Sequence, residues 1–256
     1  MRDTAGRTIS VSIDERVFVN FPAIEIGGFA ASGITRVSAA ITSEGIEQFW
    51  SVAAALPPGD AGAEDSAIAI AASHRWRRRP GEPGPSHTYA RTVETRVRRL
   101  VECGLMECVP VVALYTGISA RHYVSCAGYD VDALPDDAIQ LRPARLLSDW
   151  FVPLGAQPNE VRQAPGDIVY AAGRTVLRSL FNPSDSRQTC LTRESARAVF
   201  LAEALTSEQS PAVHAALGEL YQFLSDRGAR VSAPVFANDA RPQILLELDE
   251  QDSRKW

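Results

Sequence analysis

Lysine is almost absent from this chain. Of its 26 basic residues only Lys255 is a lysine, and the others are arginines. Cysteine is also scarce, and the four cysteines follow no CxxC or CxxH spacing, which argues against a zinc site or a redox pair. No apolar run reaches the roughly 20 residues that span a bilayer, and no basic, apolar leader precedes the first strand-like run. We therefore expect a cytoplasmic protein that has no membrane partner.

Several catalytic signatures are missing as well. The sequence contains no GxGxxG, no Walker lysine, no GxSxG elbow and no HExxH. These absences argue against nucleotide-dependent, serine-hydrolase and zinc-peptidase activities, and we expect neither a cofactor nor a metal. No repeat, low-complexity tract or linker divides the 256 residues. We therefore expect one domain over residues 1–248 and a frayed polar tail over residues 249–256.

Hydrophobic spacing predicts both strands and helices. Strands are expected at residues 9–13, 17–21, 24–30 and 231–236, with a hairpin over 167–181 around Gly173. Helices are expected at residues 43–56, 63–78, 91–101, 192–205 and 210–224. Residues 109–115 fit either a buried strand or the start of a helix. The predicted class is α+β, with a mixed or antiparallel sheet flanked by helices.

Charge is unevenly distributed along the chain. Residues 74–99 contain eight arginines against Glu82 and Glu94, a net charge of +6. Because the whole chain carries −5, the remainder carries −11. A long polyanion is held through many phosphate contacts, so an acidic chain with one basic segment suits a small anionic ligand better. We expect a small-molecule substrate and no nucleic-acid partner.

Five stretches of the sequence occur in a familiar order. Residues 91–94 (RTVE), 109–115 (VPVVALY) and 128–130 (GYD) are followed by 165–170 (PGDIVY) and by 189–203. This order resembles the B3/4 domain of the phenylalanyl-tRNA synthetase β-subunit and its free-standing relatives, and it covers about half of the chain. The resemblance implies a single B3/4-like domain in which residues 189–203 contribute to a closing strand pair and helix.

Some free-standing proteins that this chain resembles are bacterial Pictet–Spengler cyclases, homodimers that make β-carbolines in specialised metabolism. They join tryptophan to a small aldehyde through an iminium and then close a ring. The resemblance implies that Glu94 loses and regains a proton as general acid and base, and that His87 positions the aldehyde or relays a proton. An arginine would hold the substrate carboxylate. The predicted substrate-binding residues are Arg75, Trp76, Arg77, Arg91 and Tyr115.

Alternatives remain open at each of these positions. Glu94 could form an exposed ion pair with Arg98 one helical turn away, and the arginines of 75–79 could be a solvated face. Aromatic residues that could wall an indole pocket, including Tyr129 and Phe151, are more often core. His122 and His214 are expected to be structural, and the cysteines buried. The alternative function is a stand-alone aminoacyl-tRNA editing deacylase, and a third reading is a non-catalytic binder of an aromatic amino acid.

Overall fold

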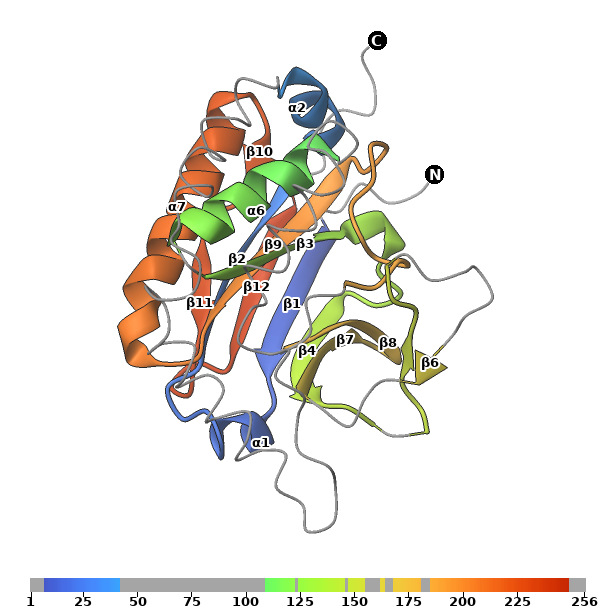
Figure 1. Ribbon diagram of the computed structural model, residues 1–256, viewed down its shortest axis with the longest axis vertical. Coiled ribbons are helices and arrows are strands. Elements are labelled where there is room, and N and C mark those ends of the chain that lie inside the picture. Colours follow the sequence, from blue (N-terminus) through green and yellow to red (C-terminus); the bar gives the residue numbers. More distant parts are fainter. Residues whose placement is uncertain are drawn as a thin grey trace.

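Two β-sheets and a layer of helices make up the fold of the computed structural model (Figure 1). The structure describes residues 7–41, 109–122, 124–145, 147–154, 162–163, 168–180 and 185–248. Within them, the larger sheet has the strand order β12 (Gln243–Leu248), β1 (Arg7–Ile13), β4 (Ala138–Pro143), β7 (Ile168–Ala172), β8 (Thr175–Ser179), β5 (Trp150–Phe151) and β6 (Arg162–Gln163). The smaller sheet has the order β10 (Arg230–Val231), β2 (Glu25–Ser32), β9 (Arg197–Ala204) and β3 (Ser125–Asp130), with β11 (Val235–Ala237) also pairing β2.

The helices lie mainly on one side of the smaller sheet (Figure 1). They are α1 (Glu15–Phe18), α2 (Ile34–Ala40), α6 (Pro110–His122) and α7 (Ser210–Asp226), with short 3-10 turns η2 (Val131–Ala133) and η3 (Ser207–Gln209). The apolar stripe of α7 packs onto β2 and β9, as its spacing predicts. No helix in the described part of the chain is both long and apolar enough to cross a membrane.

Strand β9 lies between two hydrophobic clusters and contributes side chains to both. Ala198, Phe200 and Ala202 face the cluster formed with α2, α6 and α7. Val199 and Leu201 face the cluster formed with the larger sheet. Because neighbouring residues of a strand point to opposite faces, both faces of β9 are buried. The strand therefore has the continuous apolar sequence that is typical of a strand covered on both sides.

This double burial explains an error in the sequence analysis. Residues 192–205 are not a helix; they form a turn followed by β9. Thr192 does not cap a helix, since its N–H and the Ser195 hydroxyl close the turn with a 2.9 Å hydrogen bond. The run of apolar residues fits a helix or a strand equally well, and pairing with β2 and β3 on either side decides between them.

A second error concerns residues 17–21, where we expected a strand. They belong instead to α1 and the turn after it. Asp14 starts this helix, because its carboxylate accepts a 3.0 Å hydrogen bond from the Arg16 N–H. Val17 is the one buried residue within α1. A local cap therefore outweighs the apolar run.

Other expectations are confirmed. Strand β1, strand β2, helix α7 and the β7–β8 hairpin form as predicted, with Gly173 at a φ of 58° in the hairpin turn. Residues 109–115 begin helix α6, and residues 231–236 divide between β10 and β11. The α+β class is confirmed. The expected helices at 43–56, 63–78 and 91–101 and the tail at 249–256 lie outside the described residues.

Two glycines in β2 allow strand β9 and helix α7 to pack closely against this strand. A Cβ on Gly28 would lie 2.5 Å from the Leu201 Cδ2 atom and 2.9 Å from the Phe200 carbonyl oxygen. A Cβ on Gly27 would lie 2.4 Å from the Leu217 Cδ1 atom of α7. Glycine lowers strand propensity, but here its missing side chain is what the packing requires.

Candidate functional site

Most of the predicted site residues cannot be placed. Arg75, Trp76, Arg77, His87, Arg91 and Glu94 lie outside the described residues, and their roles stay predictions. Among the described residues, Ile41 at the end of α2 and Val109 before α6 both contact the same hydrophobic cluster. The described residues on either side of positions 42–108 therefore both lie at the helical layer.

The described aromatic candidates do not come together. Tyr115 is buried in α6, with its ring centroid 6.1 Å from that of Phe200 in an edge-on contact. Tyr129 belongs to the cluster between the two sheets, and Phe151 to a third, small cluster on the larger sheet. These three aromatic side chains occupy three separate parts of the core, and they do not wall one indole pocket.

A buried polar cluster between the sheets is the strongest candidate site within the described residues. Its members are Ser125 on β3, Tyr170 on β7, Arg178 on β8 and Glu203 on β9. Arg178 is 1% exposed, Tyr170 0% and Glu203 6%. Buried ionisable groups from several strands are typical of functional sites, although structural ion pairs share this property. The cluster is called the Arg178–Glu203 cluster below.

The contacts within the Arg178–Glu203 cluster are dense. The Arg178 Nη2 group contacts both carboxylate oxygens of Glu203, and the Nη1 group donates to the Ser125 hydroxyl at 3.0 Å. The Tyr170 hydroxyl donates to Glu203 Oε2 at 3.1 Å. The Arg178 guanidinium also lies 5.0 Å from the centroid of the Tyr170 ring. Residues from both sheets thus meet at one carboxylate.

Burial and charge set the protonation states in this cluster. Burial raises the pKa of Tyr170 well above its ordinary value, and the Glu203 charge raises it further, so the phenol stays neutral. For Arg178, burial works to lower the pKa, but Glu203, Tyr129, Tyr170 and Asp185 together outweigh burial and the pKa is raised. The result is a permanent cation beside a carboxylate and a neutral hydroxyl donor.

In this arrangement both oxygens of the Glu203 carboxylate have partners. Arg178 contacts both of its oxygens, and Tyr170 donates to one of them. Among the described residues, the buried Arg178 Nε group has no hydrogen-bond partner. The contacts of the cluster join the two sheets, and its carboxylate is already paired.

Two other sets of charged side chains in the described residues also form ion pairs. Arg142 and Asp149 are 1% and 0% exposed and form a two-point ion pair at 2.6 and 3.0 Å, and Asp149 also accepts the Arg145 N–H at 2.6 Å. Between α6 and α7, Glu219 contacts Arg121 and, at 2.6 Å, the His122 ring. Both groups join elements of the fold.

A serine, a glutamate and a histidine meet at the start of α7. Ser210 donates to Glu25 Oε1 at 2.6 Å, and His214 Nε2 lies 3.0 Å from the same oxygen. The His214 ring stacks on Phe236 with centroids 3.7 Å apart. Catalysis by a serine requires a base beside its hydroxyl. Here both Ser210 and His214 contact Glu25 instead, so the group fastens α7 to β2 and β11.

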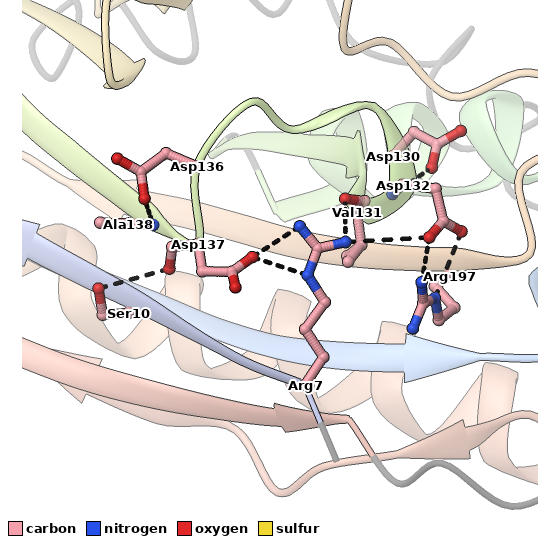
Figure 2. A network of polar contacts seen from close by, with 9 residues as sticks. All are labelled: Arg7, Ser10, Asp130, Val131, Asp132, Asp136, Asp137, Ala138 and Arg197. Carbon is pink, nitrogen blue, oxygen red and sulfur yellow. Dashed lines mark hydrogen bonds and ion pairs between the residues drawn. The ribbon is translucent and has the colours of Figure 1, made fainter. Parts of the chain in front are cut away.

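Figure 2 shows an ion-pair network on the surface where β1 begins. Arg7 donates from Nε to Asp137 at 2.7 Å and from Nη1 to the Val131 carbonyl at 2.8 Å. The Asp132 carboxylate contacts Arg197, and Asp132 Oδ1 lies 3.9 Å from Arg7 Nη1. Exposed pairs of this kind contribute little. No metal-binding group of three His, Cys, Asp or Glu side chains occurs in the described ranges.

Sequence reasoning missed the Arg178–Glu203 cluster, but a signal was present. Arg178 interrupts the apolar β8 sequence TVLRS, and Glu203 interrupts the apolar β9 sequence AVFLAEA. A charged residue inside a buried strand needs a partner, because burying an isolated charge is costly. The two interruptions therefore indicated a pair, but only the sheet arrangement brings them together.

The chain has a distant structural likeness to a known protein, without a matching sequence family. Neither a protein-family profile nor a curated protein sequence matches this chain. The chain is an α+β protein of two sheets, with helices mainly on one side of the smaller sheet. It is similar to the crystal structure of an N-terminal fragment of the phenylalanyl-tRNA synthetase β-subunit from Pyrococcus horikoshii, with 12% identity and a TM-score of 0.44. The match covers 90% of this chain and 54% of that one, so the chain spans about half the length of the fragment.

Proposed function

We propose that this protein is a cofactor-independent Pictet–Spengler cyclase that condenses tryptophan, or a substituted tryptophan, with a small aldehyde. The observation that carries the proposal is the basic segment 74–99 with Glu94, in a chain whose remainder is acidic. The resemblance of residues 91–203 to free-standing B3/4 proteins supplies the reaction class.

The proposed chemistry divides three tasks among three residue types. An arginine such as Arg77 binds the substrate carboxylate with a two-point, always-charged fork. His87 positions the aldehyde. Glu94 first donates a proton as the carbinolamine loses water, and then removes the ring proton that restores the aromatic indole.

Contacts among the described residues favour Glu94 in the proton-transfer role. The described buried carboxylates are Asp149 and Glu203. Each is held by an arginine, and each accepts a further hydrogen bond, from the Arg145 N–H or the Tyr170 hydroxyl. A carboxylate whose oxygens already have partners suits a structural role better than proton transfer.

The charge distribution favours a small substrate over tRNA. Outside residues 74–99 the chain carries −11, and tRNA binding depends on many cation–phosphate contacts. Several of the described arginines, among them Arg7 and Arg197, already pair with aspartates on the surface. A single amino-acid carboxylate needs only one arginine fork.

The direct test is turnover with defined substrates. Purified protein is incubated with L-tryptophan and a panel of small aldehydes, and chiral chromatography with mass detection follows the tetrahydro-β-carboline. The expected result is one stereoisomer, formed faster than in protein-free buffer. Glu94→Gln is expected to abolish the enhancement, whereas Glu247→Gln, an exposed β12 carboxylate, is a matched control that retains it. A mixture of the two diastereomers formed at the protein-free rate refutes the proposal.

The resemblance to a synthetase domain makes aminoacyl-tRNA editing the second candidate. The same protein preparation is given tRNA for phenylalanine that has been mischarged with tyrosine. Release of tyrosine at catalytic protein concentrations, with strong salt dependence, favours editing. If tryptophan raises the melting temperature without turnover in either assay, the protein is a binder of the amino acid.

A further inference from the structure

Three exposed apolar side chains lie close together in sequence around β5. Leu147 is 82% exposed, Trp150 45% and Leu154 56%. Among the described residues they are three of the five large apolar side chains that are strongly exposed, and the other two are Val19 and Leu245. Leu147, Trp150 and Leu154 are called the apolar strip below. A group of exposed apolar side chains of this size often marks a contact surface.

The backbone holds Leu147 in an unusual conformation. Its φ of 72° is the one positive value of a non-glycine residue in the described ranges. Two backbone hydrogen bonds close the turn around it. The Arg145 carbonyl accepts the N–H groups of Ser148 and Asp149 at 3.1 and 3.0 Å. The buried Asp149 carboxylate in turn binds Arg142. Backbone strain of this kind persists where the surroundings impose it, and it is concentrated at functional sites.

Described backbone groups along the strip are satisfied internally. The Trp150 N–H donates to the Arg174 carbonyl at 2.9 Å, and the Leu154 N–H to the Asp185 carbonyl at 2.8 Å. The Val152 carbonyl accepts the Arg187 N–H at 2.8 Å. A segment whose backbone hydrogen bonds are already made can enter a region of low polarity without leaving polar groups unpaired.

Exposed arginines lie next to the strip in the chain or across a backbone hydrogen bond. Arg145 belongs to the turn below Leu147, while Arg174 and Arg187 are bonded through their backbones to Trp150 and Val152. Arg174 also donates from Nε to the Ser148 carbonyl at 2.8 Å. The combination of tryptophan, leucine and arginine matches the zone where lipid headgroups meet acyl chains.

We propose that the apolar strip docks on the surface of an anionic phospholipid bilayer. Leu147, Trp150 and Leu154 enter the interface, and Arg145 and Arg174 meet headgroup phosphates. The exposed area favours a lipid surface over a second protein. Three side chains offer on the order of 300 Å², whereas a stable interface needs about 800 Å² from each partner.

The test is sedimentation of the full chain with sucrose-loaded vesicles. Anionic vesicles of phosphatidylcholine with about 30% phosphatidylserine are compared with vesicles of phosphatidylcholine alone. The expected result is binding to the anionic vesicles that weakens as salt is added. Leu147→Ser is expected to weaken it about tenfold, since a leucine side chain leaves water on binding. Val19→Ser, at a position 79% exposed, is the matched control and retains binding.

Charge is tested in the same way. Arg145→Glu is expected to weaken binding to anionic vesicles, and Arg241→Glu, at an exposed site on another part of the fold, is the control. Absence of binding to anionic vesicles, or an equal effect of Leu147→Ser and Val19→Ser, overturns the proposal. If the protein without lipid is a dimer that Leu147→Ser converts to a monomer, the strip is an interface between copies and the proposal is also wrong.

Discussion

Replacing Arg178 with methionine leaves the Glu203 carboxylate buried without its cation. Glu203 is 6% exposed, so water cannot replace the guanidinium that contacts both of its oxygens. Removing one partner of a buried ion pair costs about 3–5 kcal/mol. A typical domain has about 5–15 kcal/mol in total. We therefore expect a fall in melting temperature of roughly 10 °C, at about 2–4 °C per kcal/mol for a chain of this size.

Urea unfolding followed by tryptophan fluorescence measures this cost. The double variant Arg178→Met/Glu203→Leu is expected to recover much of the lost free energy, because no charge is then left in the core. Arg241→Met changes an exposed arginine and is expected to stay within about 0.5 kcal/mol of the parent. If Arg178→Met costs less than about 1 kcal/mol, or the double variant is no more stable than the single one, the pair is not desolvated as inferred here.

Three further outcomes follow from local contacts. Burial raises the pKa of Tyr170, so the free energy of unfolding should fall as pH rises above about 10, and Tyr170→Phe should reduce that slope in urea titrations. Gly28→Ala should cost about 1–3 kcal/mol, because its Cβ would lie 2.9 Å from a backbone oxygen, whereas Gly218→Ala, on α7 with no atom within 4 Å, should be neutral or stabilising in the same assay. Asp14→Ala should cost about 1 kcal/mol at neutral pH as the α1 cap is lost. A hydrogen bond from Arg16 lowers the pKa of Asp14, so this difference should fade as pH falls below about 4 in acid unfolding.

The sequence predicts elements whose two faces differ. Helix α7 shows an apolar stripe and β1 alternates, and both form where expected. Strand β9 was predicted as a helix because its faces are equally apolar, and burial on both sides removes the periodic signal. Strands β3, β4 and β12 were not predicted at all. Their place depends on partners distant in the chain, as in the pairing of β12 with β1.

The candidate sites differ in how far sequence reasoning reaches them. Arg178 and Glu203 are 25 residues apart on strands of different sheets, so no local pattern joins them. The roles of Glu94 and His87 rest on a resemblance and on charge, and they stay predictions. Residue type alone does not identify a pocket residue, because an aromatic ring can belong to a core or to a pocket. Tyr115 packs against Phe200 and belongs to the core.

The pairing of β1 with β12 joins nearly opposite ends of the described chain, with Arg7 opposite Leu248. On the ribosome, β12 emerges long after β1, so the larger sheet cannot be completed until the residues between them have been made. Strand β4, its other neighbour, also arrives more than a hundred residues later. A nascent strand with both edges unpaired is prone to aberrant association. Slow folding, with β1 unpaired until its partners are made, is therefore the consequence expected of this topology.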